Sequence, residues 1–153
     1  MWTTCRRGHA HWGRHGAAGL LLADRGQVLL QLRARWAHQG GTWSIPGGAI
    51  ERGEDAVGAA LREAGEELGL DPALVRVHGS RVARCGGWSY ETVLGRPHAD
   101  AVVDLHDHAE SDGHRWVPQA EVASLRLHPA FAAAWSDPDA ILRDFVAGAG
   151  TES

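Results

Sequence analysis

Three glutamates, Glu63, Glu66 and Glu67, stand close together near the middle of the chain. In a helix, spacings of three and four residues place their carboxylates on one face. Each like-charge pair at this spacing destabilises an isolated helix by roughly 0.2–0.5 kcal/mol, so the arrangement is costly unless it binds something. Hard divalent cations prefer several carboxylate oxygens from one rigid element. The cluster therefore predicts a divalent-cation site, with a solvated acidic face as the alternative.

The same segment contains the net charge of the whole chain. The 153 residues include 15 basic and 19 acidic side chains, which give a formal net charge of −4. Residues 51–67 hold six acids and two arginines, so the acids and arginines elsewhere cancel. A polyphosphate would be repelled by this segment unless bound cations first reversed the local field. The absence of a basic excess argues against a nucleic-acid polymer as the partner.

The residues around these acids have a specific order and spacing. A glycine is followed six positions later by a glutamate, then by an Arg-Glu pair, a Glu-Glu pair, and a glycine with an aliphatic residue after it. This pattern resembles the signature of the Nudix hydrolases, the MutT-like superfamily. Residues 43–48 look like the family's usual approach to it, and residues 110–118 look like its late loop and strand. The residues in register are Gly48, Glu54, Arg62, Glu63, Glu66, Glu67, Gly69 and Leu70.

The resemblance implies an α/β protein with the Nudix fold, in which helices sandwich a mixed β-sheet (α/β/α). We expect one domain over residues 1–153, with about fifteen N-terminal and about six C-terminal residues loosely ordered. The implied activity is hydrolysis of a diphosphate linkage in a nucleoside triphosphate or oxidised nucleotide, by attack of water at phosphorus. The alternatives are ADP-ribose, a nucleotide sugar, a dinucleoside polyphosphate or an isoprenoid diphosphate as substrate, and a nucleotide-sensing domain without catalysis.

The family pattern also implies roles for the acidic residues. Glu63, Glu66 and Glu67, together with the carbonyl of Gly47, would hold Mg²⁺ or Mn²⁺. Arg62 would orient the glutamates by ion pairing, with Glu54 as a partner. A general base is needed near the attacking water, and Glu63 is the first candidate, followed by Glu110.

Several residues outside this pattern suit contacts with the substrate. Arg33 and Arg35 lie where a strand passes into a loop, a position suited to phosphate, although arginine is also common at strand ends. Trp36, Trp88 and Tyr90 could stack on a nucleobase. The alternative for these aromatic residues is a place in the core or scaffold.

The pattern of apolar residues and turns predicts the elements that must position these groups. A turn at residues 24–26 joins two strands, and Gly69 ends a central helix that begins near Glu54. The Asp137-Pro138 pair is typical of a helix start. We predict strands at 16–23, 27–33, 74–84, 88–94, 99–105 and 115–117, and helices at 54–68, 118–125, 129–135 and 137–146.

The N-terminal residues offer ligand types without a recognisable spacing. Cys5, His9, His11 and His15 match no compact zinc pattern, and the segment leads directly into a strand, so we expect no zinc site there. Two distant cysteines exclude a disulfide framework and favour a reduced compartment. The apolar run 16–23 has only eight residues and is followed by Asp24-Arg25-Gly26 instead of a small-residue cleavage site, so we expect a cytoplasmic protein without a membrane segment. The resemblance also allows a homodimer, which is common in the superfamily.

Overall fold

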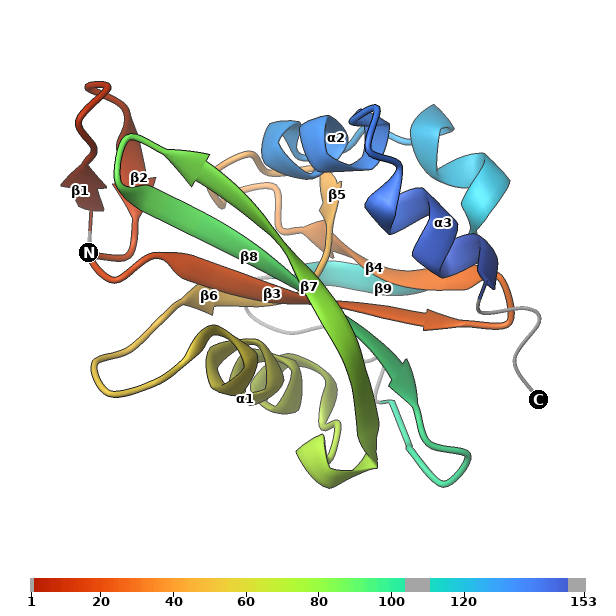
Figure 1. Ribbon diagram of the computed structural model, residues 1–153. Helices are drawn as coiled ribbons and strands as arrows, with labels where there is room; N and C mark the ends of the chain where they lie inside the picture. Colours follow the sequence, from red (N-terminus) through yellow and green to blue (C-terminus); the bar gives the residue numbers. More distant parts are fainter. Residues whose placement is uncertain (1, 104–110, 149–153) are drawn as a thin grey trace.

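A computed structural model describes residues 2–103 and 111–148 (Figure 1). Its main sheet has seven strands in the order β5-β4-β3-β8-β7, with β6 also pairing β3 and β9 also pairing β4. Strands β3 and β8 run parallel and the other pairs run antiparallel, so the sheet is mixed, as predicted. The strands are β3 (Ala17–Asp24), β4 (Gln27–Arg33), β5 (Trp43–Ser44), β6 (Gly47–Ala49), β7 (Val75–Cys85), β8 (Trp88–Pro97) and β9 (Ser111–Pro118).

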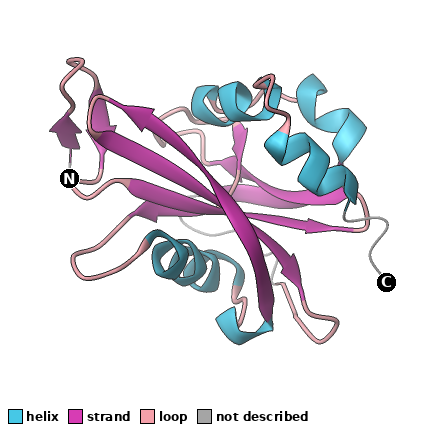
Figure 2. Ribbon diagram, viewed as in Figure 1, coloured by secondary structure: helices cyan, strands magenta, loops and turns pink. Residues whose placement is uncertain are grey.

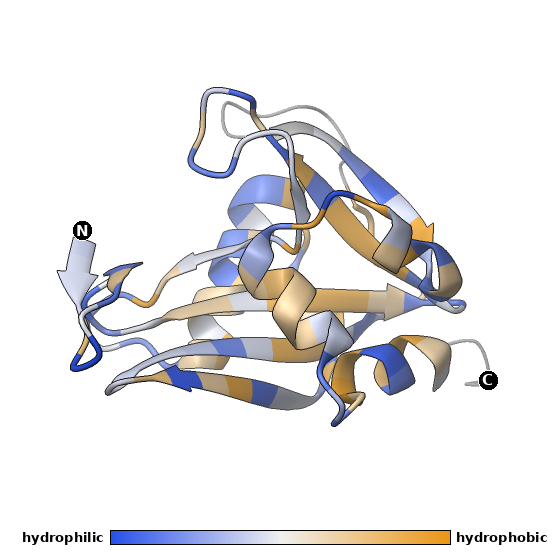
Figure 3. Cartoon of the chain, turned by 90° about the horizontal axis from the view of Figure 1, so that it is seen from above, coloured by the Kyte–Doolittle hydropathy of each residue, from blue (hydrophilic) through white to orange (hydrophobic). Residues whose placement is uncertain are grey.

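Helices cover both faces of this sheet (Figures 1 and 2). Because strand side chains alternate, Leu20 and Leu22 of β3 pack in the core beneath α1, whereas Leu21 and Ala23 pack in the core beneath α2 and α3. Burying each such leucine contributes roughly 1.5–3 kcal/mol. Figure 3 shows the hydrophobic residues concentrated along the central strands. The α/β/α prediction is confirmed, with α1 (Ala56–Leu68) and η1 (Pro72–Leu74) on one side and η2 (Gln119–Ser124), α2 (Pro129–Ser136) and α3 (Ile141–Gly148) on the other.

Helix α1 carries the predicted acidic face, and both of its ends are capped. The side chain of Asp55 accepts a hydrogen bond of 2.7 Å from the backbone N–H of Gly58. Gly69 adopts the left-handed conformation (φ 63°) and ends the helix where the sequence predicted. The helix begins two residues later than predicted because the carboxylate of Glu54 instead accepts from the backbone N–H of Glu51, at 3.0 Å.

The hairpin between β3 and β4 is confirmed, whereas four other predicted elements differ. Residues 99–103 form a turn and irregular chain instead of a strand, because the N–H of Ala101 bonds to the carbonyl of His98; residues 104–105 lie outside the described residues. The last helix starts at Ile141 because Ala140 has a φ of 58° and breaks the helix there. Residues 119–124 form a 3₁₀ helix, and β9 begins at Ser111 and follows β4 as its antiparallel partner.

The N-terminal residues form a hairpin that the sequence did not predict. Strands β1 (Trp2–Thr4) and β2 (Ala10–Trp12) pair antiparallel, with Trp2 opposite Trp12. The indole rings of these two residues meet edge to face at 5.6 Å. In the part of the chain that the structure describes, no helix is both long and apolar enough to cross a membrane.

Candidate functional site

The guanidinium of Arg62 lies at the centre of the acidic face of α1. Its Nε donates to Oε2 of Glu54 at 2.8 Å, and its Nη2 donates to Oε1 of the same carboxylate at 3.0 Å. The two side chains are only 25% and 18% exposed, so this bidentate pair is largely shielded from water. The pair that the sequence predicted is therefore present, and it fastens the loop before α1 to the middle of the helix.

Arg62 also contacts three further carboxylates and one backbone carbonyl. Its Nη1 lies 3.1 Å from Oε1 of Glu63, 3.5 Å from Oε1 of Glu66 and 3.6 Å from Oε1 of Glu51. Its Nη2 donates to the carbonyl of Ala49 at 3.1 Å. One cation thus offsets part of the repulsion among four acids. Glu51 and Ala49 were not predicted, because nothing in the spacing shows how the loop before α1 folds back.

These contacts keep the members of the pair charged. The hydrogen bond from Arg62 is the main cause that lowers the pKa of Glu54 below its ordinary value. The same hydrogen bond, assisted by the charges of Glu54, Glu63 and Glu51, raises the pKa of Arg62. At neutral pH the site therefore contains a fixed carboxylate–guanidinium pair, and the guanidinium of this pair also contacts Glu51, Glu63 and Glu66.

Glu63 lies directly against the backbone of strand β6. A Cβ atom at Gly48 would stand 2.5 Å from Oε1 of Glu63 and 2.7 Å from its Cδ, so a larger residue at position 48 would displace this carboxylate. Strand β6 is itself held by β3, with Gly48 opposite Ala18 and Gly47 opposite Gly19. The short strand therefore holds Gly48 against the carboxylate of Glu63, with Gly47 next to it on the same strand.

Tyr90 connects this region to the neighbouring strand. Burial raises the pKa of its hydroxyl, and the negative charges of Glu67 and Glu63 raise it further, whereas the charge of Arg33 lowers it. A Cβ atom at Gly47 would lie 3.0 Å from that hydroxyl. The structure thus brings Tyr90, two of the predicted metal ligands and one predicted phosphate contact into one electrostatic neighbourhood.

The other predicted substrate contacts lie in different surroundings. Arg33, at the end of β4, donates from its Nε to the carbonyl of His38 at 2.8 Å. Arg35 and Trp36 are exposed in the loop that follows, and 73% of Trp36 is accessible to solvent. Trp88 instead packs on the N-terminal hairpin. Glu110, the second candidate base, lies outside the described residues.

The glutamate face fits a hard divalent cation by the chemistry of its donors. Glu63, Glu66 and Glu67, with the carbonyl of Gly47, would offer oxygen ligands alone, the set that Mg²⁺ and Mn²⁺ prefer. Arg62 holds two of these carboxylates in hydrogen-bond contact and so keeps them oriented. Among residues 2–103 and 111–148, the carboxylate oxygens of Glu63, Glu66 and Glu67 do not all lie within 4.8 Å of one another; the ligand atoms that do converge belong to two cysteines and two histidines in the N-terminal hairpin and the β7–β8 turn.

Sequence comparison identifies the family to which this fold and site belong. The sequence model of the NUDIX domain matches residues 13–140. The chain belongs to the Nudix family. The matched range contains the whole glutamate face and every strand of the main sheet.

Relatives within the Nudix family carry nucleotide-related names. The chain is 46% identical over 145 residues to the "Putative 8-oxo-dGTP diphosphatase 3" of Mycobacterium tuberculosis, covering 88% of this chain and 66% of the relative. It is 38% identical over 143 residues to a "Nucleoside triphosphate pyrophosphatase/Nudix hydrolase fusion protein" of Bifidobacterium longum, covering 88% of this chain and 30% of the relative. The chain therefore spans less than two thirds of each of these proteins.

Solved structures support the same conclusion about the fold. The crystal structure of a Nudix hydrolase from M. smegmatis, RenU, is 42% identical and superposes with a TM-score of 0.77, covering 88% of this chain and 89% of that one. A C. elegans Ap4A hydrolase, at 20% identity and a TM-score of 0.66, shares the fold.

Proposed function

We propose that this chain is a pyrophosphohydrolase that cleaves the diphosphate linkage of a nucleoside triphosphate or of an oxidised nucleotide. The observation that carries the proposal is the Arg62 centre, where one guanidinium holds Glu54, Glu63 and Glu66 beside the glycines of β6. The name of the mycobacterial relative, an 8-oxo-dGTP diphosphatase, supports a nucleotide as the substrate class.

The site requires a cation before it can accept such a substrate. Glu63, Glu66, Glu67 and the carbonyl of Gly47 are the groups that would hold Mg²⁺ or Mn²⁺. When bound, the cation would neutralise phosphate charge and lower the pKa of the attacking water. Without it, residues 51–67 would repel a polyphosphate.

Two residues of α1 have the remaining roles in the proposed reaction, as general base and as positioning residue. Glu63 is the proposed general base, because Arg62 fixes its carboxylate at 3.1 Å and Gly48 leaves room for it against β6. As the oxygen of water bonds to phosphorus, the bridging P–O bond breaks and its electron pair leaves with the second phosphoryl product. The water proton passes to the carboxylate of Glu63. Arg62 acts as a positioning residue.

One of the predicted aromatic residues is better placed than Trp88 to stack on the base of the nucleotide. The ring of Trp36 is largely exposed, whereas one face of Trp88 is already covered by the imidazole of His11 at 4.0 Å. We therefore favour Trp36 for stacking on the base, which is worth roughly 1–3 kcal/mol in comparable settings. Trp36→Ala should raise KM for a nucleotide about tenfold and leave kcat close to that of the wild type.

The test is a hydrolysis panel with the full chain. Nucleoside triphosphates, 8-oxo-dGTP, ADP-ribose, a nucleotide sugar and a dinucleoside polyphosphate are each supplied with Mg²⁺, with Mn²⁺ and with a chelator, and the products are separated by ion exchange. We expect metal-dependent conversion of a triphosphate to the monophosphate and pyrophosphate. Turnover restricted to the other compounds would overturn the substrate class, and no metal-dependent turnover of folded protein would overturn the enzymatic proposal.

A further inference from the structure

Four side chains with metal-ligating atoms meet where the N-terminal hairpin touches the β7–β8 turn. They are Cys5, His9, His11 and Cys85, and their sulfur and ring-nitrogen atoms all lie within 4.8 Å of one another. The sequence did not predict this site, because Cys85 lies 80 residues beyond Cys5. His15, which shares the same N-terminal segment, is not part of the group.

Two separations within this group are close to the edge lengths of a zinc coordination tetrahedron. The two sulfur atoms are 3.4 Å apart, and Nδ1 of His9 lies 3.1 Å from the sulfur of Cys85. Zinc binds sulfur at about 2.3 Å and nitrogen at about 2.0–2.1 Å, so tetrahedral geometry places the ligand atoms about 3.3–3.8 Å from one another. The sulfur–sulfur and sulfur–nitrogen distances lie within about 0.5 Å of these values, and the other ligand atoms lie within 4.8 Å of them.

One of the four residues has a buried ring nitrogen without a protein partner. Nε2 of His11 is inaccessible to solvent and makes no hydrogen bond with any residue that the structure describes. The imidazole is stacked on the indole of Trp88, with ring centroids 4.0 Å apart and an interplanar angle of 5°. Trp88 is in turn held by a hydrogen bond of 2.8 Å from its Nε1 to the carbonyl of Gly13. The ring is thus held in place while its buried nitrogen lacks a ligand.

We propose that Cys5, His9, His11 and Cys85 bind one Zn²⁺ ion in a structural site. The two cysteines would bind as thiolates and the two histidines as neutral imidazoles, so binding releases the thiol protons to solvent. Two cysteines and two histidines form a closed tetrahedral set, which leaves no position for a substrate. The site would fasten the N-terminal hairpin to the β7–β8 turn, and it is separate from the oxygen donors of α1.

The backbone around the cluster already has the form that such a site needs. A turn from Cys5 to Gly8 is closed by a hydrogen bond of 2.9 Å from the N–H of Gly8 to the carbonyl of Cys5. The N–H of Arg6 donates to the carbonyl of Gly86 at 2.9 Å, which joins the two turns. A Cβ atom at Gly86 would lie 2.8 Å from the backbone nitrogen of Arg7, so glycine is what allows this close approach.

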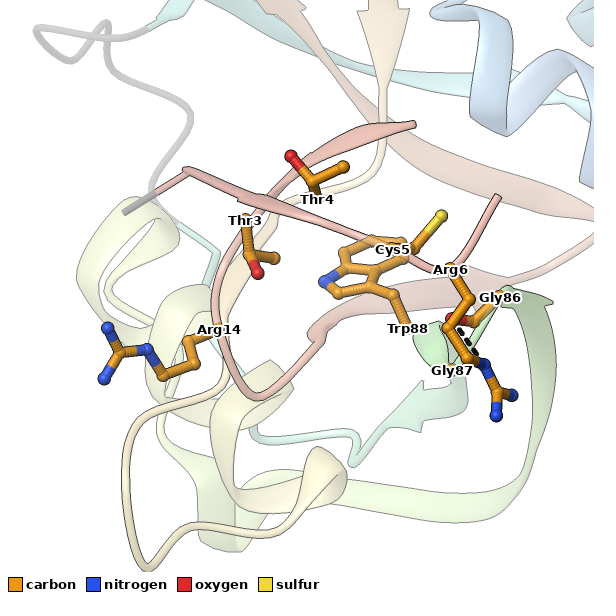
Figure 4. A pocket seen from close by; sticks show the side chains of 8 residues that line it. All are labelled: Thr3, Thr4, Cys5, Arg6, Arg14, Gly86, Gly87 and Trp88. Atoms are coloured by element: carbon orange, nitrogen blue, oxygen red, sulfur yellow. Dashed lines mark hydrogen bonds between the residues drawn. The ribbon is translucent and has the colours of Figure 1, made fainter. Parts of the chain in front are cut away.

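A neighbouring hollow would give an ion access to the cluster. A pocket of about 360 Å³ lies beside the hairpin, and Cys5, Arg6, Gly86 and Trp88 are among the residues that line it (Figure 4). Figure 4 shows Cys5 on the wall of this pocket, next to the ring of Trp88. A metal site needs such an entry path as well as its ligands.

The competing chemistry at this place is a disulfide between the two cysteines. Both are free thiols in the structure, and a disulfide would require their sulfurs to approach to about 2.05 Å with release of two electrons to an oxidant. A disulfide would consume both sulfur ligands, so the zinc site and the disulfide exclude each other. The experiment therefore has to separate the two.

Cobalt substitution in the full-length, reduced chain tests the proposal. We expect one equivalent of Co²⁺ to produce thiolate-to-cobalt charge-transfer absorption and the intense d–d bands of tetrahedral cobalt, both removed by one equivalent of Zn²⁺. The bands should be lost in Cys85→Ser. In His9→Gln, the affinity for Co²⁺ should fall at least tenfold; the side chain of His9 is exposed, so this variant is expected to fold. His15→Gln is the matched control, and Glu67→Gln excludes a contribution from the carboxylates; both should retain the bands.

Two further measurements give the outcomes that would overturn the proposal. Thiol alkylation and intact-mass measurement, made without reductant but with Zn²⁺, should find both cysteines reduced. A chain lighter by two hydrogens, in which neither cysteine can be alkylated, would show a disulfide instead. Trypsin should cut at the exposed Arg6 and Arg7 more slowly with Zn²⁺ than with a chelator in the wild type and equally in Cys85→Ser. Reduced wild-type protein without thiolate-to-cobalt absorption would exclude the site.

Discussion

The glutamate face of α1 and the cysteine–histidine cluster assemble their donor atoms in opposite ways. Glu63, Glu66 and Glu67 come from little more than one helical turn, and an arginine holds two of them by ion pairs. Cys5 and Cys85 come from two hairpin turns, and their sulfurs touch each other directly. The first set is all oxygen and suits hard, exchangeable cations, whereas sulfur and nitrogen suit zinc. The comparison separates a site suited to catalysis from one suited to fastening the fold.

The largest expected effect comes from removing one carboxylate of the glutamate face. Glu67→Gln keeps the size of the side chain and removes one negative charge. We expect kcat with Mg²⁺ to fall by about 100-fold or more, because a metal ligand is lost, while the protein stays folded and like-charge repulsion decreases. The measurement is steady-state kinetics on the preferred nucleotide, with circular dichroism to verify folding. Glu121→Gln, on the exposed surface of η2, is the matched control; equal activity of both variants would contradict the metal-ligand role.

The next effect concerns the arginine that organises the same face. Arg62→Lys keeps the charge but cannot form the bidentate pair with Glu54 or reach Glu63, Glu66 and the carbonyl of Ala49 together. We expect kcat to fall about 10–100-fold with a smaller change in KM, and unfolding free energy to fall by about 1–3 kcal/mol. Kinetics and urea unfolding measure the two effects. The control, Arg115→Lys, disturbs only an exposed pair with Glu121 and should change neither kcat nor the free energy of unfolding. An unaltered kcat in Arg62→Lys would show that Arg62 is not a positioning residue.

Zinc should raise the thermal stability of the protein through the cysteine–histidine cluster and not through the glutamate face. Zinc at about 100 times its dissociation constant would stabilise the folded chain by about 2.7 kcal/mol, which for this size corresponds to a rise in Tm of about 5–10 °C. Calorimetry should show that rise in the wild type and in Glu67→Gln, and none in Cys85→Ser. With Mg²⁺ in place of Zn²⁺, the change in Tm should be the same in the wild type and in Cys85→Ser. A zinc-dependent rise of equal size in Cys85→Ser would place the stabilising metal elsewhere.

The smallest expected effect is the pH dependence of the pair between Glu54 and Arg62. Because the folded-state pKa of Glu54 lies below its ordinary value, the pair stabilises the folded protein fully above the unfolded pKa of about 4.3 and loses this contribution as the pH falls through the folded pKa. Urea midpoints at pH 6 should therefore be lower for Glu54→Gln than for the wild type. The difference should shrink toward zero as the pH falls below 4. A difference that stayed constant down to pH 3 would show that this pair is not its source.

Local pattern was enough to predict the elements whose ends are set by their own residues. Gly69 ends α1 where predicted, because glycine adopts the left-handed conformation without a Cβ clash. The turn at residues 24–26 joins β3 to β4 as predicted, and Gly26 has a φ of 75°, which glycine adopts without steric cost. Over residues 99–103, the described part of the predicted strand 99–105, the prediction was wrong, because a local turn bond from the N–H of Ala101 to the carbonyl of His98 forms there, and apolar composition does not reveal it.

The sequence by itself determined the acidic helix face, because spacings of three and four residues place helical side chains together, and it determined the family resemblance, which implied the pair between Arg62 and Glu54. Glu54 precedes α1, so its approach to Arg62 depends on how the loop before the helix folds. Only the tertiary structure decided that Glu63 lies against Gly48, that Tyr90 lies near Glu67 and that Cys85 meets Cys5. Each of these approaches joins elements that are distant in the chain: α1 to β6, α1 to β8, and the turn after β1 to the end of β7. Their approach depends on sheet register and on the packing of whole layers, which no single segment encodes.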